Sequence, residues 1–253
     1  MGVATDPRSD PAAAQLPAAR YVAIITDGNG RWARARGVPV NDGHDAGADT
    51  VKARLRDAVD LGIRELTVYS FSTENWSRPV EEVQGLMEMF SRRIARETPE
   101  LHDEGVRMRF IGRREGVSAE LQQQMDWAQE LTDTNRTITL FVAFNYGGRA
   151  EIADAFERYA AQRVALAAGE SPGTAAHGSA EEEIRGYLYA PEMHDPDLII
   201  RTSGERRLSN YLLWQSAYSE LVFRDELWPD FTRAALEESL AEFGARRRRF
   251  GGR

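Results

Sequence analysis

The chain has 253 residues, of which 42% are hydrophobic and 28% charged, and its net charge is −8. These proportions are ordinary for a globular protein, and the acidic balance argues against nucleic-acid binding. The absence of cysteine excludes disulfides and thiolate metal sites. No apolar run approaches the ~20 residues that a membrane-spanning helix needs, so we expect a cytoplasmic protein.

Residues 1–20 have a different character from the rest of the chain. They are rich in alanine and proline, and they lack the basic start and apolar core of a signal peptide. We expect a disordered leader here. Residues 21–253 contain no internal repeat and no second change of composition, which indicates one domain.

From residue 21 onward, strand and helix patterns alternate. Short apolar or β-branched runs predict strands at 21–26, 65–71, 106–112, 137–144, 197–202 and 220–223. Apolar residues at helical spacing predict helices at 42–61, 80–103, 118–131, 149–168 and 231–248. A stretch at 167–183 that contains glycine, proline and serine predicts a loop. The order favours an α/β fold with a mostly parallel sheet flanked by helices.

Four predicted strands run directly into an unusual polar segment. These segments are DGNGRW (27–32), STENWSR (72–78), NYGGR (145–149) and RTSGERRLS (201–209). Each one alone could be a turn. In open parallel sheets, however, ligands bind at the carboxyl ends of the strands, so the four segments should meet at one edge and form a site.

The segment DGNGRW suits a phosphate, although glycine and asparagine also suit an ordinary turn. As a site, Gly28 and Gly30 would let main-chain N–H groups approach a phosphate, and Arg31 would add a charged fork. Asp27 would be ionised among these groups and could hold Mg²⁺ through oxygen. As a lone motif, the structural and functional interpretations are about evenly balanced.

The other segments also have structural alternatives. Ser72 or Thr73 could simply cap a helical turn, but Asn75 could orient a proton-accepting phosphate oxygen or water. RTSGERRLS could be a solvated loop, but its start at a strand end favours an anion site. Glu220, which begins a strand, is an ordinary surface position unless it completes a metal shell with Asp27. The histidines show no zinc spacing.

Together these segments resemble the cis-prenyltransferases, the undecaprenyl diphosphate synthase family. The matching stretches are AIITDGNGRWARARG, GHDAG, YSFSTENWSRP, FNYGGR, DLIIRTSGERRLSNYLLWQSAYSELVF and LWPDF. They span residues 21–252 in the family's order. The resemblance implies a homodimeric, Mg²⁺-dependent enzyme with a six-stranded sheet and an apolar product tunnel. It would condense isopentenyl diphosphate with an allylic diphosphate such as farnesyl diphosphate, and residues 21–253 would form the catalytic domain.

The resemblance also implies residue roles. Asp27 and Asn75 match catalytic positions, and Asp27 and Glu220 match magnesium-associated carboxylates. The matched substrate-binding residues are Gly28, Asn29, Gly30, Arg31, Trp32, His44, Ser72, Thr73, Glu74, Trp76, Arg78, Arg201, Arg207, Leu208 and Ser209.

Product length is a separate question. The helix 80–103 has an apolar face that could line the tunnel, formed by Val83, Leu86, Met87, Phe90 and Ile94. Such a stripe is more often simply part of the core. Ser70 is small where the strand should face the tunnel. The resemblance implies a long-chain product of about eleven isoprene units, of the undecaprenyl or decaprenyl lipid-carrier type, with the apolar volume as the only physical limit.

The chain also departs from the family pattern. Val40 stands where many members carry an arginine that reaches the allylic diphosphate, and Thr26 stands where methionine is usual. A short-chain or irregular Z-prenyl diphosphate synthase therefore stays open, as does a non-catalytic partner subunit. The tail RRRRFGGR (246–253) resembles the family's arginine-rich tail, which reaches the partner subunit. It could instead be solvated or touch acidic lipid, and peripheral membrane contact would suit release of a lipid product.

Overall fold

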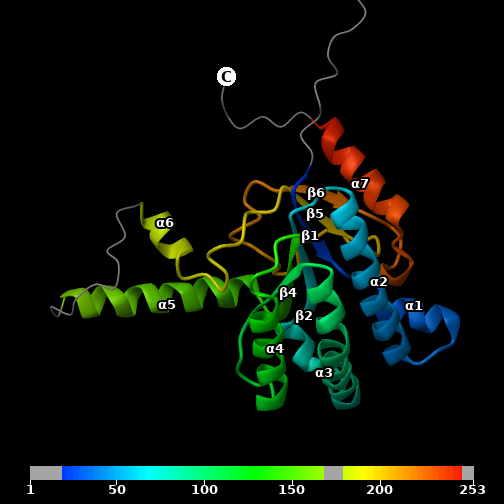
Figure 1. Cartoon of the computed structure of the whole chain (residues 1–253), viewed down its shortest axis with the longest axis horizontal. Coiled ribbons are helices and arrows are strands. Elements are labelled where there is room, and N and C mark those ends of the chain that lie inside the picture. Colours follow the sequence, from blue (N-terminus) through cyan, green and yellow to red (C-terminus); the bar gives the residue numbers. More distant parts are fainter. Residues whose placement is uncertain (1–18, 168–178, 247–253) are drawn as a thin grey trace, which may run out of the picture.

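An all-parallel sheet of six strands lies at the centre of the computed structural model, which describes residues 19–167 and 179–246 (Figure 1). The strand order is β3-β4-β2-β1-β5-β6. The strands are β1 (Tyr21–Ile25), β2 (Glu65–Ser72), β3 (Val106–Ile111), β4 (Ile138–Tyr146), β5 (Leu198–Arg201) and β6 (Glu220–Phe223). The predicted α/β class and the six predicted strands are confirmed. The sheet is wholly parallel, not only mostly so.

Helices cover the sheet and connect its strands. They are α1 (Asn29–Arg36), α2 (Val40–Asp60), α3 (Val80–Asp103), α4 (Ala119–Thr132), α5 (Gly148–Ala167), α6 (Ala180–Arg185) and α7 (Arg233–Ala245). Short 3₁₀ turns occur at η1 (Thr73–Ser77) and η2 (Trp228–Asp230). In Figure 1, α5 extends away from the sheet, and α6 lies beside α5.

The five predicted helices are present, but the sequence pattern missed α1 and α6. Residues 180–183 were expected in a loop, whereas Ser179 and Glu182 form a capping box that starts α6. Of the predicted leader, residues 1–18 lie outside the described part. The assignment of its last two residues was wrong, because Ala19 is buried in the core and the Arg20 N–H donates to Asp197 Oδ2 at 2.9 Å.

Both faces of the sheet are buried, which explains the continuous apolar runs of the strands. On β1, Val22 and Ile24 belong to the apolar core beneath α2, α3 and α7, whereas Ala23 and Ile25 face a second core around Tyr146 and Tyr211. The alternation follows from the two-residue period of a strand. The central strands are therefore fixed in register, and their carboxyl ends are rigidly placed.

Candidate active site

The carboxyl ends of β1, β2, β4 and β5 meet at one edge of the sheet, as predicted. Ile25 is level with Arg201, and Ser72 is level with Tyr146. A cavity of about 490 Å³ lies at this edge. Its lining includes Thr26, Asp27, Asn29, His44, Tyr69, Ser70, Ser72, Glu74, Asn75, Arg78, Leu86, Arg201, Ser209 and Asn210. Residues from three of the four predicted segments thus form one polar pocket, whereas no residue of NYGGR (145–149) lines it.

Asp27 lies between two arginines. Arg201 Nη2 donates to Asp27 Oδ2 at 2.9 Å, and Arg31 Nη2 lies 3.4 Å from Oδ1. Burial alone would raise the pKa of Asp27, but the hydrogen bonds from Arg201 and Ser203 and the charges of both arginines lower it overall. The carboxylate is therefore ionised at neutral pH and still has 30% of its side-chain surface exposed.

The segment after Asp27 forms the start of a helix. Gly28 precedes α1 with a φ of 117°, a left-handed conformation that favours glycine, and no side chain caps the helix. The first N–H groups of α1 can therefore bind an anion. A Cβ at Gly43 of α2 would overlap the Asn29 carbonyl oxygen. This glycine therefore lets α1 lie directly on α2.

Asn29 and His44 connect this helix start to the deeper part of the pocket. Asn29 Oδ1 is buried and has no hydrogen-bond partner. His44 Nε2 lies 3.2 Å from Glu82 Oε1, which also accepts from Arg78 Nη1 at 2.9 Å. Burial, together with the charge of Arg78, lowers the pKa of His44 despite the opposing effect of Glu82. His44 is therefore neutral at physiological pH.

The segment STENWSR forms the 3₁₀ turn η1. Ser72 precedes this turn and forms a capping box with Asn75, whose Oδ1 accepts from the Ser72 N–H at 3.0 Å, and both residues line the cavity. Trp76 lies outside this lining and donates through Nε1 to Asn145 Oδ1 at 2.7 Å. Thr73 also lies outside it. Asn75 is therefore fixed by the turn itself and still faces the pocket.

The loop after β5 places fewer of its arginines in the cavity than expected. Arg201 is 4% exposed, and its Nη1 donates to Ser209 Oγ at 2.6 Å and to the Arg207 carbonyl. The Arg207 side chain is 61% exposed and pairs with Glu205. Leu208 packs on the apolar core beyond the second sheet face. Arg201 and Ser209 therefore line the cavity, whereas Arg207 and Leu208 do not.

Two further predicted residues lie away from the pocket. Trp32 faces outward from α1, where its Nε1 donates to Asp230 Oδ1 at 2.8 Å and Arg36 stacks on its ring. Glu220 is level with Leu198 at the amino end of its strand, on the opposite edge of the sheet from Asp27. It pairs there with Arg246 at 2.8 Å. The expected Asp27–Glu220 metal shell does not exist within one chain.

Several residues that support the site were not anticipated. Thr202 Oγ1 bonds both the main-chain oxygen and the N–H of Asp27, at 2.7 and 3.0 Å. Asn210 donates to Glu74 Oε1 at 2.9 Å and accepts from the Arg149 N–H at 2.8 Å, which joins three of the four segments. Asn210 has a φ of 63°. The sequence could have indicated this left-handed conformation, because asparagine, which tolerates it, directly follows the motif RTSGERRLS.

An apolar cavity of about 120 Å³ continues from the polar one along the same sheet face. Both cavities share Thr26, Asn29, His44, Ser70 and Leu86. The expected position of Ser70 is confirmed. Of the predicted apolar face of α3, Leu86, Phe90 and Ile94 line this cavity, whereas Val83 and Met87 do not, and Met89 and Leu101 take part instead.

Two carboxylates, Asp27 and Glu74, line the polar cavity, and Asp27 is the one at the carboxyl end of β1. Among the described residues, no group of three or more His, Cys, Asp or Glu could hold a metal by itself. Mg²⁺, however, is commonly bound by one or two carboxylates together with substrate phosphates. The partly exposed carboxylate of Asp27 fits an ion that arrives with a diphosphate. No helix in the described part of the chain is long and apolar enough to cross a membrane.

Comparisons with known proteins agree with this architecture. The chain is 50% identical to isoprenyl transferase 2 of Bradyrhizobium diazoefficiens over 232 residues, which is 92% of this chain and 90% of that protein. It is 48% identical to an isoprenyl transferase of Thermotoga maritima over 237 residues, 92% and 97% of the two chains.

Solved structures show the same fold. Lavandulyl diphosphate synthase from Lavandula x intermedia, in complex with dimethylallyl diphosphate, superposes with a TM-score of 0.83 at 33% identity over 93% of this chain and 99% of that one. A probable undecaprenyl diphosphate synthase from Campylobacter jejuni gives 0.73 at 26% identity, over 93% and 100%. A family model described as "Putative undecaprenyl diphosphate synthase" matches residues 25–251. The chain belongs to this family of isoprenyl transferases.

Proposed function

We propose that this chain condenses isopentenyl diphosphate with an allylic diphosphate, such as farnesyl diphosphate, to give a Z-polyprenyl diphosphate. The observation that carries the proposal is the continuity of two unlike cavities. A charged pocket at Asp27 and Arg201 opens into an apolar one along α3. A growing prenyl diphosphate has the same two parts, a charged head and a hydrocarbon tail.

Within this proposal, each residue of the pocket has a separate role in the condensation. The start of α1 and Arg31 would hold the allylic diphosphate, and Arg201 with Ser209 would hold the diphosphate of the second substrate. The allylic C–O bond breaks, the new C–C bond forms, and a proton leaves isopentenyl diphosphate. Asn75 would orient the phosphate oxygen or water that accepts this proton. Preorganised positive groups around the leaving diphosphate lower the barrier.

Mg²⁺ is the proposed cofactor, and Asp27 is the residue that would hold it. When bound, the ion would supply positive charge to the diphosphate that leaves. Asp27 suits this role because it is ionised and partly open to the cavity. Glu220 would have to act from outside this pocket, since it lies at the opposite edge of the sheet.

The product is proposed to be long, of the undecaprenyl or decaprenyl type that carries cell-wall precursors. The stripe of α3 that lines the apolar cavity extends from Leu86 to Leu101, and such a stretch of helix is about 22 Å long. Ser70 adds little bulk where the two cavities join.

A second candidate is a short or irregular product. The similarity to lavandulyl diphosphate synthase favours it, as does Val40 at a position where an arginine is usual in the family. The reach of the lining residues along α3, from Leu86 to Leu101, argues against it, because a short tail would contact only the first part of this stripe. A non-catalytic partner subunit is disfavoured because Asp27, Asn75 and Arg201 share one pocket.

Product analysis separates these functions. Purified protein would be incubated with labelled isopentenyl diphosphate, Mg²⁺ and dimethylallyl, geranyl or farnesyl diphosphate in turn, and the dephosphorylated products separated by length. The proposal predicts a ladder of regular Z-prenyl products that ends at a long chain. A single ten-carbon branched product would support the irregular synthase. No product with any primer would support the partner subunit.

We also propose a homodimer in the cytoplasm with peripheral membrane contact during product release. Phe156 and Val164 on α5 are 58% and 71% exposed, which is unusual for large apolar side chains and suits an interface. Light scattering on the purified protein tests the dimer. In the arginine-rich tail only Arg246 is described; residues 247–253 lie outside the described part. Deleting residues 249–253 and measuring turnover tests its proposed catalytic role.

A further inference from the structure

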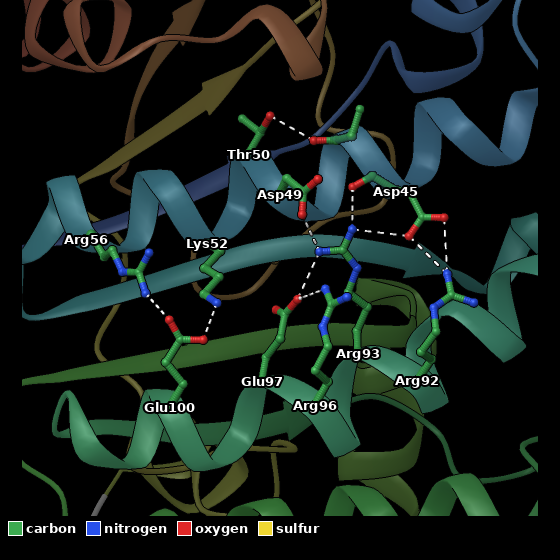
Figure 2. Close-up of polar contacts among 11 residues, drawn as sticks. Asp45, Asp49, Thr50, Lys52, Arg56, Arg92, Arg93, Arg96, Glu97 and Glu100 are labelled. Carbon is green, nitrogen blue, oxygen red and sulfur yellow. Dashed lines mark hydrogen bonds and ion pairs between the residues drawn. The ribbon is translucent and has the colours of Figure 1, made fainter.

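Charged side chains bridge α2 and α3 along the outer side of the apolar cavity. Figure 2 shows these residues meeting between the two helices. Asp45 and Asp49 of α2 face Arg92 and Arg93 of α3, and Lys52 and Arg56 of α2 face Glu100. Because α2 and α3 are also walls of the cavity, this ladder of ion pairs closes the cavity on the side away from the sheet.

Arg93 lines the apolar cavity together with Lys52 and Glu97, and it is the most buried of these three charged side chains. It is 8% exposed and lines the apolar cavity, whereas the side chain of its neighbour Arg92 is 54% exposed. Apolar residues such as Phe90 and Ile94 line the same cavity. Its Nε atom is buried and has no hydrogen-bond partner. Arg93 is thus a buried charged side chain in the wall of a mostly apolar cavity.

The guanidinium is held firmly in this position. Nη2 donates to the Asp45 carbonyl at 2.8 Å and to its Oδ1 at 3.1 Å, and Nη1 donates to Glu97 at 2.9 Å and to Asp49. Burial lowers the pKa of Arg93, but its carboxylate partners more than offset this, so it stays charged. A side chain with this many fixed bonds cannot swing aside cheaply to make room for a growing tail.

The position of Arg93 along α3 decides which part of a growing tail would meet it. Arg93 lies about halfway along the lining stripe that extends from Leu86 to Leu101. The side chains that the sheet contributes to this lining are mostly apolar and include Val68, Leu140 and Val142. A tail that grows from the charged pocket therefore passes Leu86 first and must then fit between Arg93 and the sheet.

We propose that Arg93 is a residue that determines product length, because it fixes the width of the tunnel at mid-depth by tying α3 to α2. The inference rests on the proposed function and adds a specific determinant to it. The ligand it meets is the hydrocarbon tail of the prenyl diphosphate. Arg93 does not line the charged pocket, so replacing it should leave the binding of both diphosphates unchanged.

The test compares Arg93→Leu with Arg92→Leu. Both variants remove a partner of Asp45 on the same helix, but only Arg93 borders the cavity. Loss of Arg93 leaves Glu97 paired with Arg96 at 2.9 Å, and Asp49 is already 69% exposed. Product lengths with farnesyl diphosphate would be measured together with KM for both substrates, and circular dichroism would check folding.

The expected result is a shift of the longest product upward by at least one isoprene unit in Arg93→Leu, with KM values within about twofold of the wild type. Arg92→Leu should give the wild-type distribution. An unchanged or shorter distribution in folded, active Arg93→Leu would overturn the inference, as would an equal shift in Arg92→Leu. If Arg93→Leu does not fold, Arg93→Gln should show the same direction. A wild-type protein without any prenyl product would instead refute the proposed function.

Discussion

Arg201 Nη2 lies 2.9 Å from Asp27 Oδ2, and this contact joins the ends of two neighbouring parallel strands. The arginine is almost fully buried, whereas the carboxylate keeps one side open to the cavity. The pair therefore sets the charge of the site before any substrate arrives. In the proposed function, Arg201 would hold the diphosphate of the second substrate and Asp27 would hold the metal.

Replacing Arg201 with methionine should weaken both binding and stability. Asp27 would lose its strongest cationic partner, so its pKa would rise toward the ordinary value. Because Asp27 is partly exposed, we expect a loss of about 1–3 kcal/mol, less than for a fully buried pair. Urea unfolding measures the stability, and KM for isopentenyl diphosphate should rise at least about tenfold. Unchanged values of both would contradict the assigned role.

His44 predicts a dependence of stability on pH. Its folded-state pKa is lowered, first by burial, so the unfolded chain takes up a proton more readily. Stability should therefore be complete above about pH 6.5 and fall as the pH drops toward the folded-state pKa. His44→Gln removes this term, worth about 1.4 kcal/mol per unit of lowering. Urea unfolding of both proteins at about pH 7.5 and about pH 5.5 measures it. An equal loss in both proteins would show that His44 is not responsible.

Gly43→Ala should damage the site from outside the cavity. The added Cβ would overlap the Asn29 carbonyl and push α1 away from α2. We expect a loss of about 1–3 kcal/mol in stability and a raised KM for the allylic diphosphate, since the start of α1 moves. The neighbouring exposed Asp42 provides a control, because Asp42→Ala should change stability by less than about 0.5 kcal/mol. Similar effects of both changes would argue against the close packing.

Ser70→Phe should shorten the product. Ser70 lines both cavities, so a phenyl ring there would fill the passage between the charged pocket and the tunnel. The longest product should fall by at least one isoprene unit while the first condensation persists. Chromatography of products from short and long incubations distinguishes early termination from slow elongation. An unchanged distribution would place the tail along another path.

The strands were predictable because a parallel sheet buried on both faces requires nearly continuous apolar runs. The site followed from the same rule, because polar segments that directly follow parallel strands must share an edge. The sequence pattern missed α1, since only Ala33 of that helix is buried and no apolar stripe marks it. Its helical start was therefore visible only as a run of glycine and asparagine.

The wrong prediction of an Asp27–Glu220 metal shell and the failure to single out Arg93 have different causes. Glu220 begins its strand, whereas Asp27 follows one, so the parallel order already separated them, and the resemblance to the family hid this. Arg93 could not be separated from Arg92 by sequence. Adjacent arginines on a helix differ by about 100° in direction, and only the packing of α2 shows which one faces the cavity.

The most direct test of the account is the dependence of prenyl transfer on Asp27 and on Mg²⁺. Incorporation of labelled isopentenyl diphosphate onto farnesyl diphosphate would be measured for the wild type, for Asp27→Asn and for the wild type with EDTA. The account predicts metal-dependent synthesis that EDTA abolishes and that Asp27→Asn reduces by at least about 100-fold. Equal turnover in Asp27→Asn, or full turnover in EDTA, would contradict the placement of the reaction at this carboxylate.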